Sequence, residues 1–160
     1  MDEKALMACF AYVDLNPVRA GLTEAPEHFD YASIAERTHL LALDQDRSYD
    51  GETPHGLLPF IGCPRQDVPK GLPFRLNDYL ELVDWTGRAM LENKCGYIPG
   101  DKPPMLERLQ IEPKHWLCMT QYFESRFKGL VGTSYKLKSV CRKLDYQRTP
   151  NLGAVLQLLT

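Results

Sequence analysis

The chain has 160 residues, enough for one ordinary domain or for a short segment joined to a small domain. Hydrophobic residues make up 44% of the sequence and charged residues 25%, which is typical of a folded globular protein. The wholly apolar runs are only a few residues long, and no secretory signal opens the chain, so we expect no membrane partner. The five cysteines are odd in number and widely spread, with no Cys-x-x-Cys pair, so the sequence indicates neither a disulfide framework nor a zinc site and favours the reducing cytoplasm.

The net charge of −2 hides an asymmetry along the chain. Residues 1–70 hold 6 Lys/Arg against 12 Asp/Glu, whereas residues 71–160 hold 13 against 9. Within residues 120–148 the excess is 7 basic over 2 acidic residues. Such a segment can follow a phosphate backbone, but a solvated helix face has the same composition. The basic residues that we predict to bind DNA here are Arg126, Lys128, Lys136, Lys138, Arg142 and Lys143.

Two helices are predicted in residues 1–43. The first covers residues 3–16, with Leu6, Cys9, Phe10 and Val13 at the spacing of one apolar face. Pro17 should end or bend it, because the residue before a proline avoids helical geometry. The second covers residues 33–43, where a Ser is followed three residues later by a Glu, the spacing of a capping box.

Residues 44–73 are rich in proline and glycine, and we predict a linker or an irregular loop there. Its apolar patch, residues 57–61, is expected to dock on a neighbouring surface. Residues 74–160 then form a small helical unit, so the predicted fold class is mainly α. The expected helices cover residues 77–93, 103–109, 113–130 and 133–144. The Trp and Phe residues of the third of these helices have helical spacing and are predicted to be core.

Chemistry is suggested by Tyr12 and Asn16, which lie four residues apart and therefore share a helix face. A phenol can attack phosphorus and form a covalent intermediate. Its ordinary pKa near 10 means that it needs a metal ion or a base beside it, and an amide oxygen is a suitable hard ligand for Mg²⁺. A Tyr and an Asn at this spacing also arise often by chance, so the spacing alone leaves both interpretations open.

Residues 12–21 read YVDLNPVRAG. This run resembles the catalytic helix of the REP-associated tyrosine transposases, single-tyrosine members of the HUH superfamily, whose pattern is Tyr-x-x-(Leu/Ile)-Asn-Pro-(Val/Ile/Leu)-(Arg/Lys)-Ala-Gly. Residues 26–34 are similar to the aromatic-rich segment that follows this helix in the family. Residues 78–153 are similar to the C-terminal extension of a longer proteobacterial subgroup. The resemblance therefore covers most of the chain, and the run of residues 12–21 is its most specific part.

The resemblance implies a role for three residues. Tyr12 matches the nucleophile that attacks single-stranded or hairpin DNA and leaves a 5′-phosphotyrosine with a free 3′-hydroxyl. Asn16 matches the residue that helps to hold Mg²⁺ or Mn²⁺, and Arg19 matches a basic position that contacts phosphate. The family's metal site also needs a His-hydrophobe-His pair on a strand of a ferredoxin-like α/β domain. No two histidines of this chain are two residues apart.

We therefore expect the C-terminal part of a transposase. Residues 1–43 would be the remnant of the catalytic domain, containing its last helix, residues 44–73 a linker, and residues 74–160 a helical C-terminal domain. This chain alone would bind no metal and would be inactive; the complete protein would cleave and rejoin DNA in the cytoplasm, at the nucleoid, with a homodimer possible. A non-catalytic DNA-binding remnant and an interaction module that docks through residues 57–61 are the alternatives.

Overall fold

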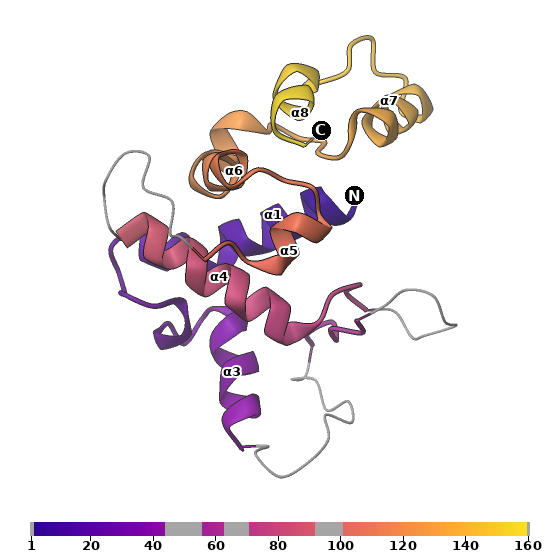
Figure 1. Ribbon diagram of the computed structural model, residues 1–160. Helices are drawn as coiled ribbons and strands as arrows, with labels where there is room; N and C mark the ends of the chain where they lie inside the picture. Colours follow the sequence, from indigo (N-terminus) through magenta and orange to yellow (C-terminus); the bar gives the residue numbers. More distant parts are fainter. Residues whose placement is uncertain (1, 44–55, 63–70, 92–100, 160) are drawn as a thin grey trace.

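The computed structural model describes residues 2–43, 56–62, 71–91 and 101–159, and these residues are mainly helical (Figure 1). Their helices are α1 (Glu3–Asp14), α2 (Asn16–Arg19), the 3-10 turn η1 (Pro26–His28), α3 (Ser33–Leu43), α4 (Leu76–Leu91), α5 (Pro104–Arg108), α6 (Pro113–Arg126), α7 (Ser134–Lys143) and α8 (Leu152–Leu158). The same residues contain no strand beyond an isolated parallel bridge between Phe60 and Leu72. None of their helices is long and apolar enough to cross a membrane. Most of the predicted linker and the predicted helix end near residue 93 lie outside the described residues.

Helix α1 exists as predicted, but its predicted apolar face is correct only in part, since Leu6, Cys9 and Phe10 pack against the edge of the core and Val13 does not. Val13 is 60% exposed, and the other residues expected on that face are only partly buried. The residues buried on α1 are Ala5, Met7, Ala8, Ala11, Tyr12 and Asp14. Helix α6 makes the most extensive helix contact with α1. Small alanine side chains let a neighbouring helix approach closely, and Leu6, Cys9 and Phe10 are left at the edge of this contact, partly buried.

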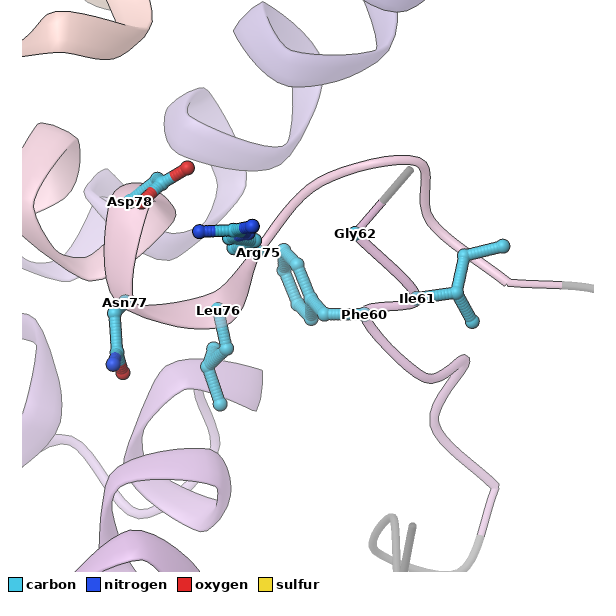
Figure 2. A pocket seen from close by; sticks show the side chains of 7 residues that line it. All are labelled: Phe60, Ile61, Gly62, Arg75, Leu76, Asn77 and Asp78. Atoms are coloured by element: carbon cyan, nitrogen blue, oxygen red, sulfur yellow. The ribbon is translucent and has the colours of Figure 1, made fainter. Parts of the chain in front are cut away.

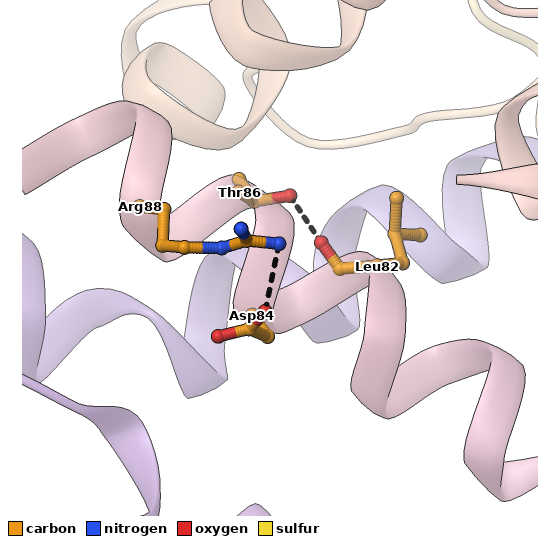
Figure 3. Close-up of polar contacts among 4 residues, drawn as sticks. All are labelled: Leu82, Asp84, Thr86 and Arg88. Carbon is orange, nitrogen blue, oxygen red and sulfur yellow. Dashed lines mark hydrogen bonds and ion pairs between the residues drawn. The ribbon is translucent and has the colours of Figure 1, made fainter. Parts of the chain in front are cut away.

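Helix α4 runs through the centre of the described structure. Tyr79, Leu82 and Trp85 on its inner side are almost fully buried. Thr86 is also fully buried, and its hydroxyl donates to the carbonyl of Leu82 at 2.6 Å, one helical turn back (Figure 3). On the outer side an exposed ion pair joins Asp84 and Arg88 at 3.0 Å. The helix is therefore amphipathic, with its polar hydroxyl satisfied inside the core.

The C-terminal helices cover one side of α1. In Figure 1, α6 lies beside α1, α8 beside α6, and α7 at the outer edge, in agreement with their contacts. The predicted core stripe of α6 is confirmed, since Trp116, Met119, Phe123 and Phe127 are buried. The helix ends at Arg126, earlier than predicted, and Tyr122 within it has non-helical angles that mark a kink. Helix α8 was not predicted.

The two predicted helical segments, residues 1–43 and 74–160, contribute to a single hydrophobic cluster. The expected docking of the apolar patch occurs within the chain. Phe60 stacks against Tyr79 of α4 with ring centroids 5.2 Å apart, and the guanidinium carbon of Arg37 lies 4.8 Å from the Phe60 ring centre. The backbone of Ile61 donates to the carbonyl of Leu72 at 2.9 Å. This patch therefore covers the core at one end of α4.

Candidate functional site

Tyr12 lies in the last turn of α1, and its ring is enclosed by two side chains. The Phe123 ring of α6 packs against it with ring centroids 5.4 Å apart. The guanidinium carbon of Arg19 lies over the ring, 4.0 Å from its centre, in the arrangement of a cation–π contact. The residue is 8% exposed, and its hydroxyl is not among the buried polar atoms without a partner. The ring is therefore largely covered, and the uncovered part of the residue is small.

Asn16 and Arg19 lie on the short helix α2, directly after Tyr12. Helix α1 ends at Asp14, Leu15 forms the junction, and Pro17 occupies the first turn of α2. The predicted helix of residues 3–16 is therefore interrupted at Leu15, one residue before the predicted position at Asn16. Arg19 donates from Nη2 to Asn16 Oδ1 at 2.6 Å. The structure therefore brings together the three residues predicted from the YVDLNPVRAG run.

Arg19 also ties this group to α6, which lies about a hundred residues further along the chain. Its Nη1 donates to the carbonyl oxygens of Gln121 at 3.2 Å and Thr120 at 3.5 Å. The kink at Tyr122 follows directly after these two residues. A phosphate that approached Arg19 would have to compete with these acceptors and with Asn16 for the same guanidinium.

The described residues do not by themselves fit a divalent metal. Of the expected ligands they contribute Asn16 alone, and its Oδ1 already accepts a hydrogen bond from a cation, Arg19. Within the described ranges no three His, Cys, Asp or Glu side chains gather as a metal would need. Mg²⁺ usually takes one or two carboxylates together with water and substrate phosphate. No step of a reaction can therefore be assigned through a metal ion in this structure.

The predicted DNA-binding residues of the C-terminal unit lie on its surface. Arg126 ends α6 and Lys128 follows it in a loop, while α7 carries the other four. All six are exposed, and in the parts of the chain that the structure describes none of them takes part in an ion pair. They are separate from the Tyr12 group in the sequence, and α7 makes its main helix contact with α8.

A buried polar cluster around Asp14 was missed by the sequence reasoning. Asp14 is 2% exposed and accepts hydrogen bonds from the Tyr79 hydroxyl at 2.5 Å and the Ser33 hydroxyl at 2.9 Å. Burial raises the pKa of the Asp14 carboxyl, opposed by these two hydrogen bonds and by the charge of Arg37. Burial, together with the charge of Asp14, raises the pKa of Tyr79 well above its ordinary value.

The cluster joins α1, α3 and α4 through side chains. The hydroxyl of Ser33 is engaged by Asp14, so it serves this contact as well as beginning α3. The signal that could have revealed the cluster is the position of Asp14, seven residues after the buried Met7 and three after Ala11. A charged residue at an inward position of a helix must find partners, because an unpaired buried charge is costly.

One further pocket, of about 420 Å³, opens between residues 60–62 and the start of α4 (Figure 2). Phe60 and Leu76 supply apolar surface, while Arg75, Asn77 and Asp78 supply polar groups. It contains none of the residues predicted for DNA cleavage or binding. Comparisons of the chain with protein-family models, curated proteins and solved structures find no match.

Proposed function

We propose that the chain is the C-terminal part of a single-tyrosine DNA transposase and supplies the tyrosine of a phosphoryl-transfer site. The observation that carries the proposal is the grouping of Tyr12, Asn16 and Arg19, with the guanidinium of Arg19 in contact with both other side chains. These are the residue types that the family resemblance implies at these positions. A phenol, an amide oxygen and a cation in one group suit the binding and attack of a phosphodiester.

In the proposed reaction, the Tyr12 oxygen attacks the phosphorus of single-stranded or hairpin DNA. The new bond joins the phenolic oxygen to phosphorus, and the bond from phosphorus to the 3′-oxygen breaks. The phenol loses its proton to a base, and the departing 3′-oxygen gains one. A divalent metal, when held by Asn16 and by a His-hydrophobe-His pair outside these 160 residues, would polarise the phosphate. Arg19 would contact a phosphate oxygen after releasing Asn16. Such a protein would act at the nucleoid in the cytoplasm.

The test joins this chain to the missing ligands. The chain is mixed with a separately produced polypeptide that carries the His-hydrophobe-His strand, with Mg²⁺ and a labelled single-stranded hairpin. We expect a covalent protein–DNA band under denaturing conditions, absent for Tyr12→Phe. Tyr31→Phe is the matched control, because Tyr31 is 91% exposed and lies outside the site. A band that persists in the Tyr12→Phe chain would refute the assignment of the nucleophile.

A second candidate function is DNA binding without cleavage. It is favoured by the enclosure of Tyr12, which is 8% exposed between Phe123 and Arg19, and by the exposed cations of α7. The two functions differ in the mixing experiment. A non-catalytic protein would retain the hairpin in a native gel and would form no covalent band with any metal or partner segment.

A further inference from the structure

We infer that the outer face of α7 binds single-stranded nucleic acid, with the ring of Tyr135 as a stacking platform for an unpaired base. This face would hold an unpaired strand in the proposed transposase. The proposed function is needed only to specify DNA rather than RNA as the strand. It does not depend on Tyr12, Asn16 or a metal ion. Its evidence is the pattern of exposure and charge along one short helix.

Only a narrow stripe of α7 faces the protein. Leu137 and Cys141, one turn apart, are the two residues of the helix that are buried, at 2% and 3% exposure. The remaining side chains form a wide outer arc, and Figure 1 shows α7 at the edge of the molecule, with α8 as its neighbour. A helix with so little buried surface has most of its circumference available to a partner.

The outer arc carries an aromatic ring followed by two cations. Tyr135, Lys138 and Arg142 are three and four residues apart in turn, so they lie along one side of α7 and span about 10 Å at 1.5 Å per residue. Tyr135 is 80% exposed, and among the described residues no aromatic ring stacks on it, so its ring faces are open to a ligand. Lys136 and Lys143 lie on the other flank of the same arc and are also exposed.

The charge of this face is not neutralised within the described residues. The four ion pairs found there all lie elsewhere, on α4, near α5 and α6, and between α1 and α5. Helix α7 itself contains four cations and no acidic residue, and Asp145 is the sole acidic residue from 125 to the end of the chain. Unpaired cations on a convex helix face complement a phosphate backbone, and they exclude a basic partner.

The exposed ring of Tyr135 favours an unpaired strand over a duplex as the ligand of α7. In a duplex the bases are stacked on one another, and a side chain outside the helix meets only phosphate, sugar and base edges. In a single strand every base has a free face, and cations that follow the backbone with an aromatic ring beside them are the usual binding surface. Tyr135 beside Lys138 and Arg142 has this composition.

The test measures binding of the full chain to labelled oligonucleotides of about 15 nucleotides by fluorescence anisotropy, with EDTA present so that no cleavage is needed. The probes are single-stranded DNA, single-stranded RNA of the same sequence and a blunt DNA duplex. We expect tighter binding to the single strands than to the duplex. Tyr135→Ala should weaken single-strand binding by roughly 5- to 100-fold, and Tyr135→Phe should retain it, because the ring rather than the hydroxyl is used.

The charge contribution is tested by the salt dependence. Replacing Lys138 and Arg142 together by Gln should flatten the slope of log K against log salt by about 1.4, at roughly 0.7 per lost contact with a single strand. The matched control replaces Lys102 and Lys114, which are paired with Glu107 and Glu112, and should leave the slope unchanged. Circular dichroism of each variant establishes that it remains folded.

Several outcomes would overturn the inference. Equal affinity for duplex and single strands, or Tyr135→Ala binding like the wild type, removes the stacking role. An equal loss in the Lys102/Lys114 control shows general attraction by charge rather than a site on α7. Equal or tighter binding to anionic vesicles than to the oligonucleotides makes the face a membrane surface. Failure of the Tyr12 band in the mixing experiment, with single-strand binding intact, would reject the proposed cleavage and leave this inference standing.

Discussion

Replacing Asp14 by Ala should lower the free energy of unfolding by about 3 kcal/mol. Two donors lose their acceptor: the buried Tyr79 hydroxyl, which bonds Asp14 at 2.5 Å, and the partly buried Ser33 hydroxyl, at 2.9 Å. A hydrogen bond to a charged group contributes ~1.5–3 kcal/mol, and a buried donor left unsatisfied costs ~1–3 kcal/mol. The Asp14→Ala variant no longer has to desolvate a carboxylate on folding, so its net loss falls below the total of these terms. A loss of this size is a large share of the ~5–15 kcal/mol that stabilises an ordinary domain.

The assay is urea unfolding at neutral pH, followed by tryptophan fluorescence and far-UV circular dichroism. Asp14→Asn keeps the size and one acceptor oxygen, so we expect a smaller loss, about 1 kcal/mol. Asp84→Ala is the control, because Asp84 is exposed and its ion pair with Arg88 should contribute less than about 0.5 kcal/mol (Figure 3). If Asp14→Ala is no less stable than Asp84→Ala, the cluster does not stabilise the fold as argued.

Asp14 should also make the free energy of unfolding depend on pH, in a direction set by its raised pKa. Burial raises the pKa of its carboxyl, so the folded chain holds this proton more tightly than the unfolded chain. Stability from this group therefore falls as pH rises from the ordinary aspartate value near 3.9 through the raised value, and it is regained on acidification. As the pH is lowered through this window, the wild type should gain stability relative to Asp14→Asn. If the difference in stability between the two does not change between neutral pH and the ordinary aspartate value near 3.9, the raised pKa is contradicted.

Two other buried or strained positions give further predictions. Thr86→Val removes the acceptor of the Trp116 indole N–H, which lies 2.8 Å from the Thr86 hydroxyl in the core, and should cost about 1–3 kcal/mol in urea unfolding, while Thr86→Ser should cost less than about 1 kcal/mol. If Thr86→Val is as stable as Thr86→Ser, the hydrogen bond from Trp116 does not stabilise the fold. Asn151→Ala should lower the melting temperature by several degrees, because Asn151 has a left-handed backbone, with φ of 57°, and its side chain bonds the backbone of Lys128 and Leu130. Asn151→Gly relieves the backbone strain and should fall between Ala and the wild type; a Gly variant below Ala would contradict that reasoning.

The helix positions could be predicted closely because local signals mark their ends. Helix α3 covers the predicted residues 33–43, and α6 begins at Pro113 as expected. Proline is favoured in the first turn, and its position is read directly from the sequence. Helix α8 was missed because Gly153 in its first turn lowers helix propensity and its cap, Asn151, adopts a left-handed conformation that the sequence does not announce.

The buried face of α1 could not be predicted from periodicity. The largest apolar side chains suggested one stripe, yet Ala5, Ala8 and Ala11 are fully buried and Val13 is exposed. Burial of alanine depends on how closely another helix approaches, and here the most extensive neighbour, α6, lies about a hundred residues away in the chain. Such a contact leaves no trace in a local pattern.

The candidate site, too, could be predicted only in part from the sequence. The spacing of Tyr12 and Asn16 predicted that they share a helix face, whereas the contacts of Arg19 with both side chains were not predicted. The Phe123 ring and the α6 carbonyls that hold Arg19 come from a distant segment, as does Tyr79, 65 residues from Asp14. The residue types of the candidate site could therefore be predicted from the sequence. The side chains that enclose Tyr12 and limit access to it could not.

Access to Tyr12 gives the last prediction, made on Arg19. In Arg19→Met the apolar stem remains, but the guanidinium that lies 4.0 Å from the Tyr12 ring centre is lost together with its bonds to Asn16 and α6. We expect a stability loss of about 1 kcal/mol, the size of one cation–π contact with partly exposed hydrogen bonds. The stability of Arg19→Lys should lie between those of the wild type and Arg19→Met, because an ammonium group cannot stack on the ring as a planar guanidinium does.

The ring itself reports on this change. Hydroxyl-radical footprinting with peptide mass spectrometry measures how fast each tyrosine is oxidised, and Tyr31, 91% exposed, is an internal standard in the same sample. Oxidation of Tyr12 should increase several-fold in Arg19→Met while Tyr31 is unchanged. Because Phe123 covers the ring from the other side, Phe123→Leu offers a second route to the same increase. If Tyr12 is oxidised at the wild-type rate in Arg19→Met, the guanidinium is not what keeps solvent, and hence a phosphate, away from the phenol.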